Sequence, residues 1–253
     1  MKRYFDKLAP VSLIIALVSA WQIVSISGLV PRFMLPSPAD ILSAIVEDFA
    51  NLMKHSYVTL SEAFCGMIIA VCLSFIISFL MDRYDVINKS IYPLLIITQT
   101  VPTIALAPIL LLWFGYGVAP KIILITISCF FPVTIGLLDG YKSSDEDSIR
   151  LLHTMGASNL QIYKYIKLPS ALGHMFASLK VAVSYSIISA VVAEWLGGES
   201  GLGVYMIRMK KSYAFDKMFA VIVVISLLSI LLMRILERFE KMLTPWNKQK
   251  IGG

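Results

Sequence analysis

Few residues in this 253-residue chain have the types and spacing that catalysis or metal binding requires. An enzyme would need a nucleophile with a base, or a set of metal ligands, facing one surface. The three histidines are instead scattered, at His55, His153 and His174, outside any HExxH-like pattern. The three cysteines lie within apolar runs without a CxxC pair, which favours packing residues over a disulfide framework. We therefore expect no catalytic residue, no metal site and no cofactor bound by this chain.

A nucleotide site is also excluded by the glycine pattern. Gly197-Gly198 and Gly201-x-Gly203 look like a phosphate loop only superficially, because no Lys-Ser/Thr pair follows them.

Two charged residues, Lys180 and Glu194, lie inside or beside an apolar run. A charge at the centre of a membrane helix costs roughly 2.5–3.5 kcal/mol on insertion scales, so each needs a reason. Together with Ser184, Ile187 and Val191 they follow steps of four and three residues along one helix face. Ser184 and Glu194 are therefore candidates for a solute path. The alternative is that Lys180 reaches the inner membrane surface and Glu194 the outer one.

A second candidate for the solute path is Thr98–Pro102. Gln99 and Thr100 are polar within an apolar run, and Pro102 frees a backbone carbonyl that protein or water must satisfy. The alternative is a packing kink in which the hydroxyls bond back to the helix.

The surrounding composition is that of a membrane protein. The chain is 58% hydrophobic and 15% charged, with mean hydropathy +0.79, whereas soluble domains are about 25% charged. The net charge of +6 collects at the ends of apolar runs and forms no aromatic-interleaved basic patch. We therefore expect a lipid bilayer as the surrounding medium and no nucleic-acid partner.

The apolar runs predict an all-α fold with about six transmembrane helices, because roughly 20 apolar residues cross the hydrocarbon core. A short amphipathic helix is expected at 41–51. The predicted spans are Leu8–Ser27, Tyr57–Met81, Ser90–Phe114, Ile122–Leu138, His174–Leu196 and Met218–Met233. The expected units are an N-terminal helix with an extracytoplasmic segment (1–56), a core domain (57–240) and a cytoplasmic tail (241–253). With both termini inside, cytoplasmic segments hold about twice as many Lys and Arg as outer ones.

One polar segment, Asp145–Pro169, separates two of these spans; it is called the loop below. Acidic residues predict a helix from Asp145 to Met155, and Gly156 permits the backbone reversal that ends it. Ser158 predicts the cap of a second helix, which Pro169 should stop. The result would be an apolar-tipped wedge that suits a groove on a soluble partner. The expected contact residues are Ser148, Ile149, Leu152, Met155, Gly156, Ala157, Leu168 and Pro169.

The spacing of Gly156-Ala157, Ile166 and Leu168-Pro169 resembles the cytoplasmic signature loop of permease subunits of bacterial ABC importers. The resemblance extends from about residue 57 to the last span. Further likeness to the nitrate, sulfonate and taurine branch, which includes permeases for thiamine-pyrimidine precursors, lies in Leu35–Asp40, Ala193–Gly198 and Gly201–Gly203. One departure is plain: the family's Glu-Ala-Ala positions hold Arg150-Leu151-Leu152 here, so the contact of that glutamate does not transfer.

The resemblance implies the type I importer permease fold in the bacterial inner membrane. It implies three partners: an ABC ATPase subunit on the loop, an extracytoplasmic solute-binding protein, and a second copy of the chain. A thiamine-pyrimidine precursor or similar heterocycle is the favoured solute, followed by sulfonate, taurine or nitrate. The alternative function is an ion-coupled secondary transporter, which usually shows two related halves and paired charges at mid-membrane. Neither is visible in this sequence.

Overall fold

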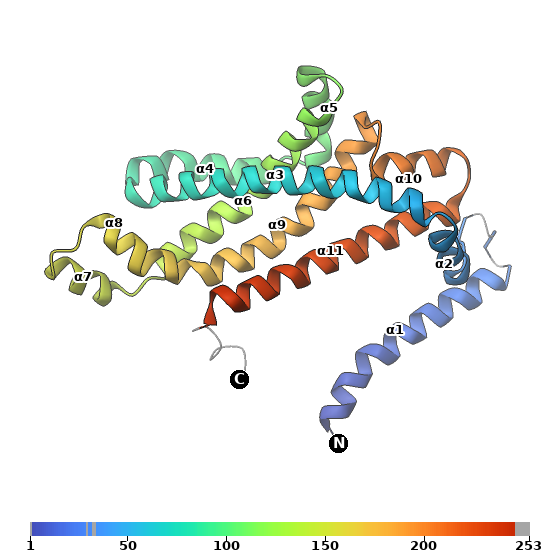
Figure 1. Ribbon diagram of the computed structural model, residues 1–253, viewed down its shortest axis with the longest axis horizontal. Coiled ribbons are helices and arrows are strands. Elements are labelled where there is room, and N and C mark those ends of the chain that lie inside the picture. The colour runs from blue at the N-terminus through green and yellow to red at the C-terminus, as the bar shows by residue number, and fades with distance from the viewer. Residues whose placement is uncertain (1, 29, 32–33, 246–253) are drawn as a thin grey trace.

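The computed structural model is helical throughout its ordered elements (Figure 1), with no strand among the residues that it describes. It describes residues 2–28, 30–31 and 34–245, and side chains from residue 12 onward. The helices are α1 (Lys2–Ile26), α2 (Pro38–Glu47), α3 (Phe49–Arg83), α4 (Asp85–Thr100), α5 (Thr103–Phe114), α6 (Val118–Lys142), α7 (Glu146–Thr154), α8 (Asn159–Ile162), a π-helical turn (Tyr163–Lys167), α9 (Leu168–Gly197), α10 (Leu202–Lys211) and α11 (Phe215–Leu243).

Four helical runs in the described part of the chain are long and apolar enough to cross a membrane: α3, α6, Asn159–Gly197 and α11. The pair α4 and α5 makes a fifth if it counts as one broken span. In α1 the apolar run with described side chains, Ser12–Ile26, is shorter than a span. The predicted first span starts at Leu8, outside the described side chains, so the sixth span stays a prediction.

The core is built by α3, α6 and α9, which lie side by side (Figure 1). Glycines let these helices approach closely. A Cβ on Gly140 of α6 would lie 2.5 Å from the Cα of Ala171 on α9, and one on Gly66 of α3 would lie 2.6 Å from Ile125 of α6. Small residues at such crossings are typical of membrane helices, where association depends on close packing.

The predicted third span, Ser90–Phe114, is not one straight helix. Its two halves, α4 and α5, meet at a bend of 100° around Val101 and Pro102. Val101 is extended because the proline ring after it disfavours the helical conformation. Pro93 and Pro108 lie inside helices without ending them.

The prediction that Pro169 stops the second loop helix is wrong. The chain runs from α8 through the π-helical turn into α9, and Pro169 lies in the first turn of α9. At the end of the π turn the N–H of Leu168 bonds to the carbonyl of Tyr163, five residues back. Pro169 has no N–H to donate to the preceding turn. We attribute its tolerance to the π-helical turn just before it, which changes the register of the helical hydrogen bonds at this place.

The predicted boundary between residues 56 and 57 falls inside α3, which is continuous from Phe49 to Arg83. The expected amphipathic helix exists as α2, but it starts earlier, at Pro38, because Ser37 and Asp40 form a capping box. Ile41 and Ala44 of α2 pack against Ala220 of α11. The N-terminal segment is therefore joined to the core. The tail predicted at 241–253 begins within α11, and residues 246–253 lie outside the described part.

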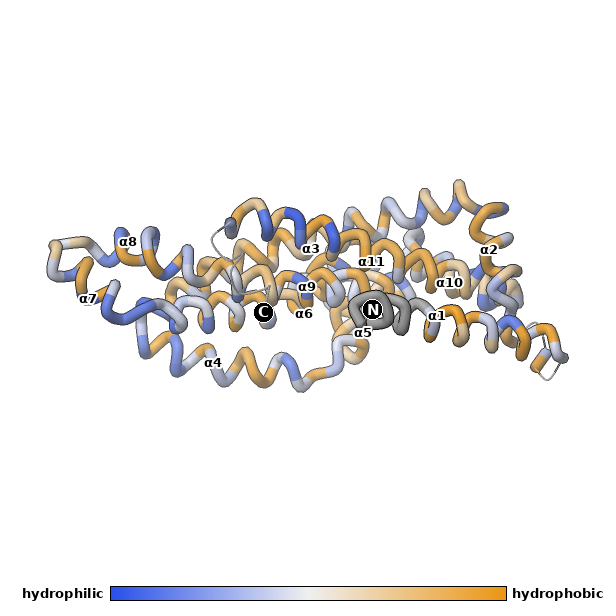
Figure 2. The backbone as a smooth tube through the Cα atoms, turned by 90° about the horizontal axis from the view of Figure 1, so that it is seen from below, coloured by the Kyte–Doolittle hydropathy of each residue, from blue (hydrophilic) through white to orange (hydrophobic). Residues whose placement is uncertain are grey.

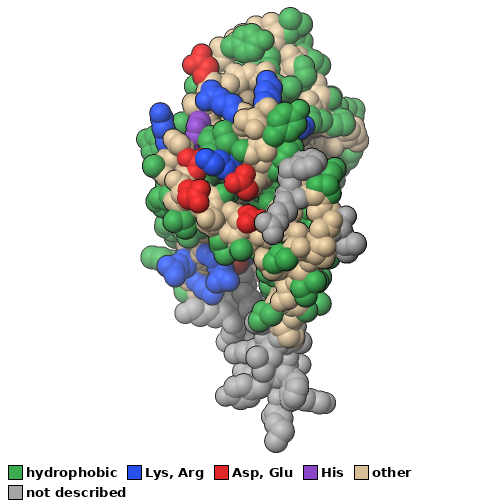
Figure 3. Space-filling view, turned by 90° about the vertical axis from the view of Figure 1, so that its right-hand side faces the viewer, with side chains coloured by type: hydrophobic (Ala, Val, Ile, Leu, Met, Phe, Trp, Pro, Cys, Tyr) green, Lys and Arg blue, Asp and Glu red, His purple; other side chains and the backbone are tan. Residues whose placement is uncertain are grey.

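The two ends of the bundle are polar and its middle is apolar (Figure 2). The loop lies at one end, beside the start of α4, and α10 lies at the other (Figure 1). The end that carries α2 and α10 shows Lys, Arg, Asp and Glu side chains together (Figure 3). This is the pattern expected of a bundle whose two ends meet water.

We predict that Gly140→Ala destabilises the bundle, because its new methyl group would overlap Ala171. Overpacking of a tight core costs about 1–3 kcal/mol, so the unfolding temperature in detergent should fall measurably. Ala119→Val, which adds volume on an exposed part of α6, is the matched control. Equal unfolding temperatures for both variants would contradict the described α6–α9 packing.

Candidate functional site

The loop begins with a firmly capped helix. Asp145 precedes α7, and its carboxylate accepts hydrogen bonds from the backbone N–H of Ser148, at 2.9 Å, and from the Ser148 hydroxyl. These bonds hold the pKa of the Asp145 carboxyl below its ordinary value. The cap is therefore complete at neutral pH, and its stabilisation is lost only as the pH falls through that lowered pKa.

The turn predicted at Gly156 is confirmed. Gly156 has φ +81°, and a Cβ placed there would meet nothing within 4 Å, so its conformation rather than space requires glycine. The N–H of Ala157 bonds to the carbonyl of Leu152, and that of Gly156 to His153, both at 3.0 Å. This pair of bonds is the Schellman motif. Ser158 then caps α8 in a capping box with Gln161, as its position predicts.

The most exposed apolar side chains of the loop are only partly those expected. Met155 is 73% exposed, whereas Ile149 and Leu152 are half-buried against the protein itself. Leu151 and Leu160, which the sequence interpretation did not single out, are 62% and 69% exposed. Ile149 and Leu152 lie on the covered side of α7, which nothing in the sequence identifies, and their role in partner contact stays a prediction. Leu168 and Pro169 lie at the root of the loop, in the first turn of α9.

Polar contacts tie the root of the loop to α3 and α6. Lys167 donates to both carboxylate oxygens of Asp82, at 2.9 and 2.7 Å. The hydroxyls of Tyr141 and Tyr163 lie 2.6 Å apart, and Phe79 packs edge-on against the Tyr163 ring. The loop is therefore fixed to the bundle where α8 continues into α9.

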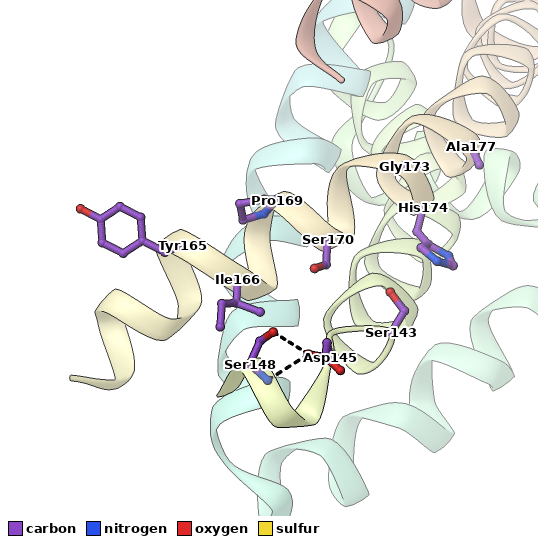
Figure 4. A pocket seen from close by; sticks show the side chains of 10 residues that line it. All are labelled: Ser143, Asp145, Ser148, Tyr165, Ile166, Pro169, Ser170, Gly173, His174 and Ala177. Carbon is purple, nitrogen blue, oxygen red and sulfur yellow. Dashed lines mark hydrogen bonds between the residues drawn. The ribbon is translucent and has the colours of Figure 1, made fainter. Parts of the chain in front are cut away.

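A cleft of about 710 Å³ separates the start of α7 from the start of α9 (Figure 4). Asp145 and Ser148 line one side, and Ile166 and Pro169 the other. In Figure 4 Ile166 points toward Ser148, whereas Tyr165 points away.

A second cavity, of about 280 Å³, lies at the elbow between α4 and α5. Of the predicted path residues, Gln99 and Pro102 line it. Thr100 and Ser184 do not; their hydroxyls donate to carbonyls of their own helices, those of Ile97 and Lys180. The structure thus brings together part of the predicted path.

Glu194 is neither at the outer surface nor open to a solute in this conformation, since it is 1% exposed. Its carboxylate accepts a hydrogen bond from the Thr59 hydroxyl, at 2.7 Å, and from the backbone N–H of Gly203, at 2.6 Å. The next amides of α10 are held nearby: Gly201 donates to His55 and Leu202 to Thr59. Side chains of α3 and α9 therefore cap the positive N-terminus of α10.

This arrangement explains the glycines after Glu194. A Cβ on Gly201 would lie 2.2 Å from the Glu194 carboxylate, and one on Gly203 would lie 2.5 Å from the carbonyl of Val191. Both positions must lack a side chain because the backbone of α10 approaches α9 so closely.

Beside Glu194 lies a buried ion pair that the sequence interpretation missed. Lys121 of α6 donates to Glu62 of α3 at 2.6 Å, and both side chains are 5% exposed. A signal was present: His55, Thr59 and Glu62 follow at i, i+4 and i+7, which places polar residues on one helix face. Its partner on α6 could not be identified without the fold.

The expectation that Lys180 reaches the inner membrane surface stays a prediction. Lys180 pairs with Glu240 of α11, at 2.7 Å, and so joins α9 to α11. Its role in the described structure is to connect two helices.

The sequence was compared with known protein families. Residues 64–245 match the family described as binding-protein-dependent transport system inner membrane component. This range includes the loop, the α4–α5 elbow and Glu194.

Curated relatives match almost the whole chain. The formylaminopyrimidine transport permease protein of Halalkalibacterium halodurans is 35% identical over 251 residues, covering 99% of this chain and 100% of the relative. The taurine transport system permease protein of Escherichia coli is 28% identical, covering 91% and 86%. The riboflavin transport system permease protein of Chloroflexus aurantiacus is also 28% identical, covering 94% and 89%.

Solved structures share the fold. An inward-facing methionine ABC transporter superposes with a TM-score of 0.68 at 17% identity, covering 78% of this chain and 97% of that chain. An amino acid ABC transporter superposes with a TM-score of 0.63 at 16% identity, covering 81% and 97%. The predicted all-α importer-permease fold is confirmed.

We predict that Glu194→Ala destabilises the protein by about 1–3 kcal/mol, because it leaves the Gly203 N–H buried without an acceptor. Denaturant unfolding in detergent measures this. Glu199→Ala removes an exposed carboxylate five residues away and should leave stability unchanged. A Glu194→Ala variant as stable as the Glu199→Ala control would show that the carboxylate does not anchor α10.

Proposed function

The chain belongs to the family of binding-protein-dependent transport system inner membrane components, and we propose that it couples a separate ATPase subunit to solute uptake. It is the permease of an ABC importer. The proposed coupling element is the loop. The observation that carries this proposal is a capped, anchored loop that exposes apolar side chains at one polar end of a membrane bundle.

The exposed side chains of Leu151, Met155 and Leu160 form the proposed docking surface. Apolar side chains on a water-facing loop are costly unless a partner covers them, and a groove on a soluble subunit suits a short helix of this shape. The charged side chains next to them pair with one another within α7. Arg150 pairs within α7, with Glu146 at 3.0 Å, and so supplies local helix support.

The loop is joined directly to a long helix. Residues 159–197 form one helical run, which reaches from the loop to Glu194. At 1.5 Å per residue such a run is about 58 Å long. A movement of the ATPase subunit against the loop would thus be carried along one rigid element to the opposite end, as rigid-body switching requires.

Two copies of the chain would enclose the solute path. Supporting this, α5 packs on α6 and α9 through Ala107 and Leu110 but projects at an angle to them (Figure 1), and it exposes Leu112 and Trp113 strongly. An extracytoplasmic solute-binding protein would dock at the charged end that carries α10 (Figure 3). In this arrangement the loop and both termini face the cytoplasm of the bacterial cell, and ATP is bound by the partner subunit only.

For the solute we propose a thiamine-pyrimidine precursor or a similar heterocycle. The relative whose printed name specifies formylaminopyrimidine transport matches over its full length and at higher identity than the taurine permease. Sulfonate, taurine or nitrate would be next.

The alternative, an ion-coupled secondary transporter, would use charges near the membrane midplane. The ion pair of Glu62 and Lys121 lies instead near the end of the bundle that carries α10, since Lys121 is in the first turn of α6. The pair joins α3 to α6 at that end and does not supply a charge near the midplane, which favours the importer function over ion-coupled transport.

We predict that Met155→Asp weakens binding of the ATPase subunit at least about tenfold, because it places a charge in an apolar contact at the cost of about 1.4 kcal/mol or more. Co-purification of the two subunits from detergent measures this. Met155 is largely exposed, so folding of the permease should not change.

Asn159→Asp adds the same charge to an exposed polar position of the loop and is the matched control. Equal recovery of the ATPase subunit with both variants would refute docking through the apolar tip. Failure of the unmodified chain to retain any ATPase subunit would refute the importer function itself.

A further inference from the structure

The cavity at the α4–α5 elbow is bordered by four helices and lies at the break in the membrane helix. Its polar members come from α4 and α5 (Thr98, Gln99, Thr103), α6 (Ser128) and α9 (Tyr185, Ser189). We propose that this cavity binds the transported solute and selects a neutral, planar molecule that has both hydrogen-bond donors and acceptors. The proposal rests on the proposed transport function and adds to it the binding site and the properties by which that site selects the solute.

The first observation is free hydrogen-bonding capacity. The Gln99 amide and the Tyr185 hydroxyl make no hydrogen bond to any described residue, whereas Thr98 is satisfied by the carbonyl of Leu95. An amide offers two N–H donors and an acceptor, and a phenol offers one donor and acceptor capacity. Ser189 donates to Ser128 at 2.8 Å, and both are buried, so the floor of the cavity presents hydroxyl oxygens as acceptors.

The second observation is the backbone of the elbow. A helix end leaves its last carbonyls, or its first N–H groups, without partners in the helix. At the elbow the C-terminus of α4 and the N-terminus of α5 are separated only by Val101 and Pro102. The partial negative charge of one end therefore lies beside the partial positive charge of the other. The elbow therefore offers hydrogen-bond donors and acceptors together. Because the two partial charges oppose each other, it attracts neither an anion nor a cation.

The third observation is charge. No Asp, Glu, Lys, Arg or His is among the residues that line the cavity. A solute with a full charge would lose its hydration here without meeting an opposite charge, which costs several kcal/mol per ion. The N-terminus of α5 alone would suit an anion, but the carbonyls of α4 oppose it at the same place. Binding of a sulfonate in this cavity is thus disfavoured, whereas binding of a neutral solute carries no such cost.

Size and shape point the same way. About 280 Å³ lies just below the usual range of ligand pockets, about 300–1,000 Å³, and suits a single substituted ring. Leu106, Ile127, Ile188 and Val192 supply apolar walls, and the Tyr185 ring offers a face for stacking. An aminopyrimidine that carries a formamide group has these properties: it is planar, neutral and rich in both donors and acceptors.

The test is saturation-transfer NMR, which detects weak binding, on the full chain in lipid nanodiscs. The probes are a neutral aminopyrimidine bearing a formamide group and taurine at the same concentration. We expect saturable binding of the aminopyrimidine and none of taurine. Gln99→Ala should weaken aminopyrimidine binding about fivefold, the effect of one lost hydrogen bond.

Thr100→Ala is the matched control, because Thr100 is the next polar residue at the same elbow but does not line the cavity. If Gln99→Ala fails to fold, Thr103→Val removes another lining hydroxyl. Binding of taurine as strong as that of the aminopyrimidine, or equal binding by the Gln99 and Thr100 variants, would overturn the proposal. Retention of the ATPase subunit, measured on the same preparation, tells that failure apart from failure of the importer function.

Discussion

The carboxylate of Glu194 is the contact on which one end of this molecule depends. It joins α9 to α3 through Thr59 and to the N-terminus of α10 through Gly203, and it is buried. A buried carboxylate is tolerated only where hydrogen bonds and nearby charge replace its hydration. Here two donors and the positive end of a helix do so. Lys121, which forms an ion pair with Glu62, adds a positive charge nearby.

The same helical run connects this anchor to the loop at the other end. From Asn159 to Gly197 the backbone is helical without a break, because a π-helical turn carries it past Pro169. Asp82 and Lys167 fix the run where it leaves the loop, and Lys180 fixes it to α11. Each of these pairs resists sliding of one helix along another. The proposed coupling function needs such an element, since allosteric coupling requires that a change at one end shifts the other.

Local patterns in the sequence predicted much of the fold and part of the site. The apolar runs predict the helices that form the bundle, and Gly156 and Ser158 predict the turn and cap of the loop, because each depends on a few neighbouring residues. Residues that depend on distant partners were read less well. Glu194 looked like a surface or path residue because Thr59 and Gly203 are not its neighbours in sequence. The covered side of α7 could not be predicted from the sequence, because only the bundle determines it. Pro169 predicts a helix stop that the structure does not have, since a π-helical turn leaves no clear sequence signal.

The most direct test of the importer assignment is the energy source of uptake in proteoliposomes. The full chain, its ATPase subunit and its solute-binding protein would be reconstituted, with a labelled formamide-bearing aminopyrimidine as solute. Uptake should require ATP on the side of the loop and should persist when ion gradients are collapsed. Uptake by the chain alone, driven by an ion gradient and independent of ATP, would contradict the account and identify a secondary transporter.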